Sequence, residues 1–262
     1  MPHTEFTRSI RGHELRVLRG GEGPPLLFLH GATGGAEWLP ALEELSARFD
    51  VIAPEHPGFG GKDAPSWLDT VNDMAYFYLD VLAALELRGV HLVGASLGGW
   101  IAAELAVRNT SRLASLTLAG AAGLHVPGVP QVDIFRSSDE QRIRDLFHDQ
   151  SLADRMVERE LRPELEDALL RDRQTAARLM WQPRSYDPHL HKWLHRVDVP
   201  TLLVWGEQDR LFPPAHAEAY RALIPGSRAT VLPECGHLPP VEKPREFVAA
   251  LNGFLAEKET SR

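Results

Sequence analysis

The chain has 262 residues, of which 44% are apolar and 24% are charged, and its formal net charge is −8. These values are typical of a globular domain and exclude a disordered or fibrous chain. The acidic balance lacks the basic patches that attract nucleic acid or anionic membranes, so neither is an expected partner. No stretch reaches the roughly 20 apolar residues of a membrane span, and the amino terminus has charges where a secretory signal has an apolar run. We therefore expect a cytoplasmic protein.

The first half of the chain alternates between strands and helices. Two short strands with a glycine turn predict a hairpin at 5–10 and 14–18, and PLLFLHG at 25–31 is typical of a strand that is covered on both faces. A helix is predicted within 36–49, where apolar residues recur at helical spacing. The remaining predicted elements of this half are a strand at 51–53, a helix at 70–87, a strand at 90–93, a helix at 97–107 and a strand at 113–118. Such alternation predicts a mostly parallel, doubly wound α/β sheet.

The strand pattern stops between residues 123 and 195. Four segments in this region open with a serine or aspartate cap or a first-turn proline and predict helices: 137–147, 151–160, 163–181 and 187–197. The alternation resumes with a strand at 200–206, a helix at 215–223, a strand at 229–232 and a closing helix. We expect a core domain of residues 1–122 and 196–262, with residues 123–195 forming a helical cap inserted after the sixth strand.

The pentapeptide Gly94-Ala95-Ser96-Leu97-Gly98 matches G-x-S-x-G at a strand-to-helix joint. Small residues on both sides let the strand and the helix approach closely while the turn pushes the serine hydroxyl outward. The alternative is a serine that merely caps the helix. The pattern predicts a nucleophile at Ser96.

A serine nucleophile needs a base and an orienting acid, and both follow in the order serine, acid, histidine. Asp209, in LLVWGEQDRLFPP, comes just after the carboxyl end of a buried strand, and His237, in LPECGHLPPVEKP, lies in a loop after the final strand. The backbone N–H groups of Ala32 and Leu97 are the expected oxyanion donors. His30 is expected to organise the loop that carries Ala32.

Five motifs, His30-Gly31, PGFGG at 57–61, GASLGG, WGEQD and GHLPPVEKP, together resemble the α/β-hydrolase superfamily over nearly the whole chain. The resemblance implies that Ser96 is the nucleophile, His237 the general base and Asp209 its partner, beneath a helical lid. A serine at 96 argues against the branches of this superfamily that use an aspartate there, the haloalkane dehalogenases and epoxide hydrolases.

The leading hypothesis is a cofactor-independent serine hydrolase that cleaves small to medium carboxylic esters through an acyl-enzyme. A carbon–carbon bond hydrolase of ring-cleavage products is the alternative, but HGATGG replaces the glycine- and proline-rich run usual in those enzymes, and Leu238 stands where they often have tryptophan. A lactonase would use the same chemistry. A hydrolase-like protein that binds its ligand without turnover is the alternative from another class. The expected partner is a small-molecule substrate, and both a monomer and a homodimer remain open.

Other signals point less strongly to a site. The single cysteine, Cys235, excludes an intrachain disulfide and a multi-cysteine metal site. His189, His191 and His195 lack clustered acidic partners, and no nucleotide-binding motif is complete, so we expect neither a metal nor another cofactor. Arg178 and Arg184 are weighed as ligands of a substrate carboxylate, with surface ion pairs as the commoner outcome. The apolar cap residues are expected mostly to pack with one another: Phe135, Phe147, Met156, Met180, Trp181, Tyr186 and Trp193.

Overall fold

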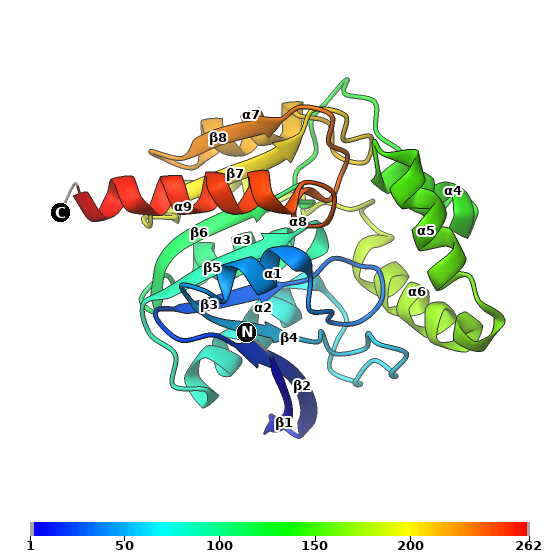
Figure 1. Cartoon of the computed structure of the whole chain (residues 1–262), viewed down its shortest axis with the longest axis horizontal. Helices are drawn as coiled ribbons and strands as arrows, with labels where there is room; N and C mark the ends of the chain where they lie inside the picture. Colours follow the sequence, from blue (N-terminus) through cyan, green and yellow to red (C-terminus); the bar gives the residue numbers. More distant parts are fainter. Residues whose placement is uncertain (1–2, 261–262) are drawn as a thin grey trace.

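One mostly parallel sheet forms the centre of the computed structural model, which describes residues 3–260 (Figure 1). Within those residues the eight strands lie in the order β1-β2-β4-β3-β5-β6-β7-β8, and β2 runs opposite to the others. The strands are β1 (Thr4–Ile10), β2 (His13–Gly20), β3 (Pro25–Leu29), β4 (Asp50–Pro54), β5 (Val90–Ala95), β6 (Leu113–Ala119), β7 (Thr201–Gly206) and β8 (Arg228–Leu232). The doubly wound α/β fold predicted from the sequence is confirmed.

Helices cover both faces of the sheet (Figure 1). One face packs against α1 (Pro40–Leu45) and α9 (Pro244–Thr260), with α8 (Pro239–Glu242) beside them, and the other against α2 (Val71–Ala84), α3 (Leu97–Arg108) and α7 (Ala215–Leu223). The central strand β3 divides its side chains between the two apolar cores, with Leu27 and Leu29 in one and Leu26 and Phe28 in the other. Burial on both faces explains why this strand is a continuous apolar run.

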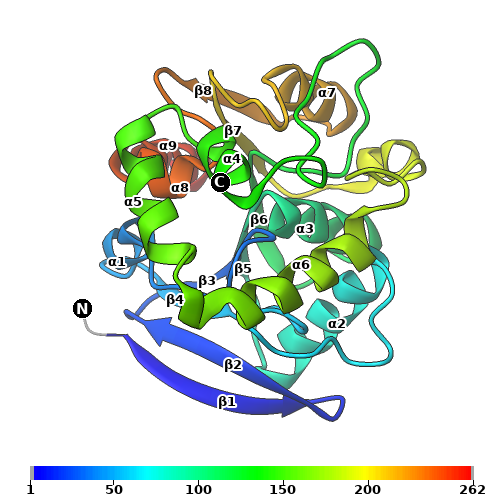
Figure 2. The same ribbon diagram turned by 90° about the vertical axis from the view of Figure 1, so that its right-hand side faces the viewer.

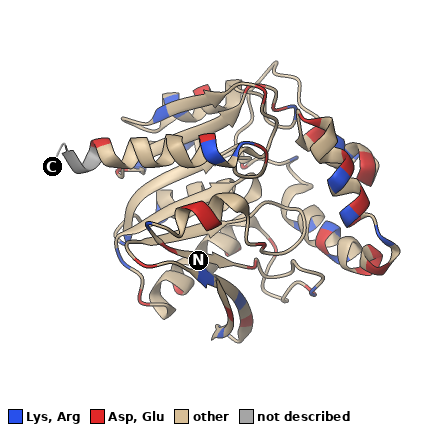
Figure 3. Cartoon of the chain, viewed as in Figure 1, with Lys and Arg blue, Asp and Glu red and all other residues tan. Residues whose placement is uncertain are grey.

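A helical segment follows β6 and lies across the carboxyl ends of the strands (Figure 2). It contains α4 (Asp139–Leu146), α5 (Gln150–Glu160), the 3₁₀ turn η1 (Pro163–Leu165) and α6 (Glu166–Met180). Ser138 caps α4 by accepting a hydrogen bond from the Gln141 N–H, and Asp149 caps α5 in the same way. Figure 3 shows that Lys, Arg, Asp and Glu are dense on these helices. We refer to α4, α5, η1 and α6 as the cap helices, after the cap that is expected from the sequence.

Two predicted helices differ from those observed. The helix expected within 36–49 begins only at Pro40, because a residue that precedes proline is driven to extended backbone, and Leu39 has φ −69° and ψ 154°. The segment 187–197 forms two 3₁₀ turns, η2 (Leu190–Lys192) and η3 (Leu194–Arg196), in place of a helix. None of the helices within residues 3–260 combines the length and apolar character needed to cross a membrane.

Candidate active site

Ser96 stands in the turn between β5 and α3 with a strained backbone. Its φ of 54° and ψ of −117° lie in a region that residues other than glycine seldom adopt. A Cβ at Gly98 would collide with the carbonyl of Leu29, and one at Gly94 with the carbonyl of Gly98, so the turn requires glycine at both positions. The hydroxyl of Ser96 makes no capping hydrogen bond to α3, which removes the main structural reason for a serine here.

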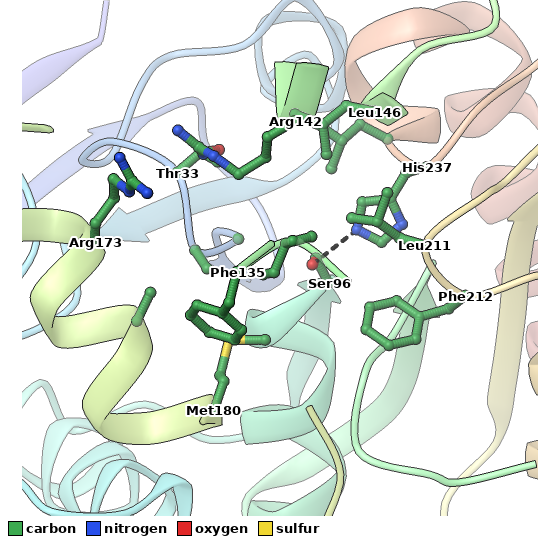
Figure 4. Close-up of a pocket in the computed structure, with 15 residues that line it drawn as sticks. Thr33, Ser96, Phe135, Arg142, Leu146, Arg173, Met180, Leu211, Phe212 and His237 are labelled. Atoms are coloured by element: carbon green, nitrogen blue, oxygen red, sulfur yellow. Dashed lines mark hydrogen bonds between the residues drawn. The ribbon is translucent and has the colours of Figure 1, made fainter. Parts of the chain in front are cut away.

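The residue predicted as the base, His237, lies within hydrogen-bond distance of both the predicted nucleophile and the predicted acid. His237 Nε2 is 2.8 Å from Ser96 Oγ, a contact drawn in Figure 4, and His237 Nδ1 is 2.9 Å from Asp209 Oδ2. The other carboxylate oxygen of Asp209 accepts the N–H groups of Leu211 and Phe212, each at 2.9 Å. Since the carboxylate can only accept from the ring, His237 carries its proton on Nδ1 and presents a lone pair to the serine.

Close backbone packing holds His237 in this position. Its N–H donates to the carbonyl of Leu146, at the end of α4, over 2.7 Å. Gly120, which follows β6 with a φ of 52°, lies against the histidine so closely that a Cβ there would collide with the His237 carbonyl. The imidazole is 1% exposed, so bulk water does not compete for its two ring nitrogens.

The expected oxyanion loop lies next to the serine. Gly31 approaches Ser96 so closely that a Cβ there would be 3.4 Å from the serine Cβ. His30 Nδ1 donates to the Gly31 carbonyl over 2.7 Å. That carbonyl shares a peptide plane with the Ala32 N–H, and in a trans peptide the two groups point in opposite directions. The histidine bond therefore orients the Ala32 N–H, while the Leu97 N–H belongs to the first turn of α3, where amides have no intrahelical acceptor.

A second histidine, His56, supports the same loop. The rings of His30 and His56 lie face to face with a 30° tilt, and their centroids are 3.8 Å apart. The Tyr78 hydroxyl donates to His56 Nδ1 at 2.6 Å, so His56 Nε2 donates to the His30 carbonyl at 2.8 Å. The His56 backbone N–H donates to His30 Nε2 at 2.9 Å. Burial lowers the pKa of His30 to about 4 and that of His56 well below its ordinary value, which keeps both rings neutral at neutral pH.

A largely apolar pocket opens above Ser96, between the strand ends and the cap helices (Figure 4). Phe135 and Met180 line it, whereas Trp181 and Trp193 are each 50% exposed and Phe147 is buried in the core. Two arginines that the sequence did not single out, Arg142 of α4 and Arg173 of α6, also line the pocket.

The other candidates from the sequence lie elsewhere. Arg184 pairs with Asp133 at 2.9 Å and stacks on Trp181, and Arg178 donates to the carbonyl of Leu68. Burial raises the pKa of the Cys235 thiol to about 12, which makes it a poor nucleophile. Three histidines in or beside η2 and η3 are exposed: His189, His191 and His195. In the part of the chain that the structure describes, no three His, Cys, Asp or Glu side chains gather to form a metal site.

Helix α6 is tied to the loop that carries the PGFGG motif. Asp172 accepts the Gly61 N–H at 2.9 Å, and Thr175 donates to the carbonyl of Gly58 at 2.7 Å. Burial raises the pKa of the Asp172 carboxyl to about 6, and the negative charges of Glu55 and Glu160 add to the rise. The pKa of Asp172 is higher in the folded state than in the unfolded state, so the folded state binds this proton more tightly. The protonated carboxyl therefore stabilises the fold at low pH, and this stabilisation is lost as the pH rises through about 6.

The stability of the Asp172→Asn variant, relative to that of the wild type, should therefore increase as the pH rises from 4 to 7. The amide retains an oxygen for the Gly61 N–H and carries no charge to desolvate. Melting temperatures of both proteins across this range measure the effect, and Asp167→Asn, at an exposed position of the same helix, is the control. A melting-temperature difference for Asp172→Asn that stays constant with pH would contradict the assignment.

Comparison with known proteins supports the fold and the assignment as a hydrolase. Residues 24–244 match the alpha/beta hydrolase fold family. The chain is 31% identical to the 2-hydroxy-6-oxo-2,4-heptadienoate hydrolase of Pseudomonas putida, over 95% of each chain. It is 29% identical to a 2-hydroxy-6-oxo-6-(2'-aminophenyl)hexa-2,4-dienoic acid hydrolase of Metapseudomonas resinovorans, over 94% of this chain and 89% of that one. The crystal structure of a bacterial membrane phospholipase A superposes with a TM-score of 0.82 and 27% identity, over 97% of this chain and 86% of that one.

The family match spans far more than half of the chain, and it includes Ser96, Asp209 and the loop that carries His237. The relatives cover nearly the full length in addition. The chain therefore belongs to the alpha/beta hydrolase fold family and is a hydrolase of that fold.

Proposed function

We propose that the chain is a serine hydrolase that cleaves small to medium carboxylic esters through an acyl-enzyme. Ser96 Oγ attacks the ester carbonyl carbon as its proton moves to His237 Nε2, and the N–H groups of Ala32 and Leu97 stabilise the oxyanion. His237 then gives the proton to the departing alcohol. A water molecule, activated by the same imidazole, releases the acid from Ser96. Asp209 holds the ring in the required tautomer throughout.

The observation that carries this proposal is the 2.8 Å contact between His237 Nε2 and Ser96 Oγ, made by a serine that forms no capping bond. A buried serine with a strained backbone and an imidazole at hydrogen-bond distance is the arrangement that activates a hydroxyl. We further propose that residues 123–195 act as a cap that closes this site, on a core made of residues 1–122 and 196–262.

Hydrolysis of a carbon–carbon bond is the second candidate function. It is favoured by the relatives named as dienoate hydrolases, at 29% and 31% identity over nearly the full chain. The same serine and histidine serve that reaction, in which the leaving carbon has to receive a proton. The HGATGG loop and Leu238 remain the two differences that favour the ester.

A substrate panel separates these functions. It contains p-nitrophenyl esters of increasing acyl length, a lactone, and 2-hydroxy-6-oxo-2,4-heptadienoate, each assayed for kcat/KM. We expect the highest value for one of the esters. A higher value for the dienoate would establish the carbon–carbon hydrolase, and a higher value for the lactone a lactonase. Absence of turnover with every compound would favour a protein that binds its ligand without reaction.

A further inference from the structure

Two arginines reach the candidate pocket from different cap helices. Arg142 comes from α4 and Arg173 from α6, and both line the cavity that contains Ser96 and His237. Figure 4 shows both guanidinium groups on the side of the view where Thr33 lies, away from the His237 ring. Most of the other lining side chains are apolar. Positive charge is therefore concentrated at one end of an otherwise apolar cavity.

The two guanidinium groups share a single carboxylate. Arg142 Nη2 and Arg173 Nη1 each lie 2.9 Å from an oxygen of Asp139. Glu160 is near enough to Arg142 to interact with its charge, and it pairs with Arg159, which also bonds Glu37 at 3.1 Å. Counted alone, the cluster of Arg142, Asp139 and Arg173 holds two positive charges and one negative charge, and Glu160 offsets part of that difference. A ligand anion can balance the rest.

Arg142 also carries a donor that the protein does not use. The residue is 8% exposed, and among residues 3–260 its buried Nε has no hydrogen-bond partner. A buried donor without an acceptor costs free energy, and more so when it belongs to a charged group. Because this Nε is buried, a ligand carboxylate in the cavity reaches it only after the Arg142 side chain rotates; its two oxygens then match the forked N–H groups of the guanidinium.

We propose that Arg142 and Arg173 form a subsite for a carboxylate on the acyl part of the substrate. The proposal rests on the proposed serine hydrolase function. His237 returns its proton to the leaving group, so the leaving group lies against the imidazole, whereas both guanidinium groups lie away from that ring, toward Thr33 (Figure 4). The substrate class that fits is a monoester of a dicarboxylic acid, bound by its free carboxylate.

The competing explanation is that the Arg142–Asp139–Arg173 contacts serve only to join α4 to α6. Under that explanation, loss of an arginine would impair all substrates alike through a displaced cap. The test therefore needs a ratio between two substrates that differ only in charge. Mono-p-nitrophenyl adipate and its neutral terminal amide form such a pair.

The wild type should hydrolyse the adipate monoester with a higher kcat/KM than the amide. Arg142→Met, which keeps a long side chain, should lower the ratio of the two kcat/KM values by about 10- to 100-fold, as expected for lost charge-assisted hydrogen bonds. Arg173→Met, at the more exposed partner, should lower the same ratio and serves as a second variant if Arg142→Met fails to fold. Arg144→Met is the matched control, because Arg144 lies on the same helix and pairs with Glu140 and Asp154.

Direct binding keeps this inference separate from the proposed reaction. Free adipate, titrated by calorimetry, should bind to the wild type and to Arg144→Met, and more weakly to Arg142→Met. Adipamide should bind weakly to all three. Binding of adipate together with absence of ester turnover would overturn the reaction and retain the subsite. Ester turnover with a charge ratio that is unchanged in both Arg142→Met and Arg173→Met would overturn the subsite and retain the reaction.

Discussion

Ser96→Ala is expected to lower kcat for an ester by about 10⁶-fold and to leave the fold intact. The hydroxyl oxygen is the atom that forms the acyl bond, and without it His237 has no nucleophile at hydrogen-bond distance. The strained backbone should persist, because it is imposed by the close approach of β5 and α3 at Gly94 and Gly98. The measurement is kcat with a p-nitrophenyl ester, together with the melting temperature.

Ser115→Ala provides the matched control. Ser115 is also a buried serine, but it lies on β6 and contacts His91 Nδ1 at 2.8 Å. Its loss should leave ester hydrolysis near the wild-type rate. If Ser96→Ala retained wild-type turnover, the proposed covalent mechanism would be wrong.

The elements that local sequence specifies were predicted well. The helix expected at 70–87 begins where Thr70 and Asp73 exchange hydrogen bonds in a capping box, a signal contained within four residues. The segment 187–197 shows the limit of such signals. It opens with an aspartate and a proline, as a helix would, yet it forms only two 3₁₀ turns, and these pack Leu190 and Leu194 into the core before β7 begins. Tertiary packing there outweighs local preference.

The same contrast between local signals and tertiary packing applies to the candidate site. Ser96 is indicated by a pattern that encodes a backbone turn, and Asp209 and His237 follow parallel strands whose carboxyl ends share one edge of the sheet. Arg142 and Arg173 were missed, because their place in the pocket depends on how the cap helices lie over that edge. One signal was present: Arg142 shares the apolar face of α4 with Ile143 and Leu146, whereas Arg144 does not.

Asp209→Asn is expected to lower kcat by about 10⁴-fold with little loss of stability. The side-chain oxygen of asparagine should keep the place of Oδ1, because that position accepts the N–H groups of Leu211 and Phe212. The amide nitrogen then takes the place of Oδ2, 2.9 Å from His237 Nδ1. Since an amide nitrogen donates, His237 has to accept at Nδ1 and carry its proton on Nε2. The imidazole then has no lone pair for the hydroxyl of Ser96.

The rotated amide would not restore activity, because it would set the NH₂ group against two backbone N–H donors. Asparagine isolates the tautomer effect, whereas alanine would also remove the acceptor of Leu211 and Phe212 and so destabilise the loop. Glu207→Gln, at an exposed acid two residues away, controls for the loss of negative charge. The measurements are kcat and the rate at which a fluorophosphonate labels Ser96, and both should fall together in Asp209→Asn. A normal labelling rate in that variant would show that His237 does not depend on Asp209 to activate the serine.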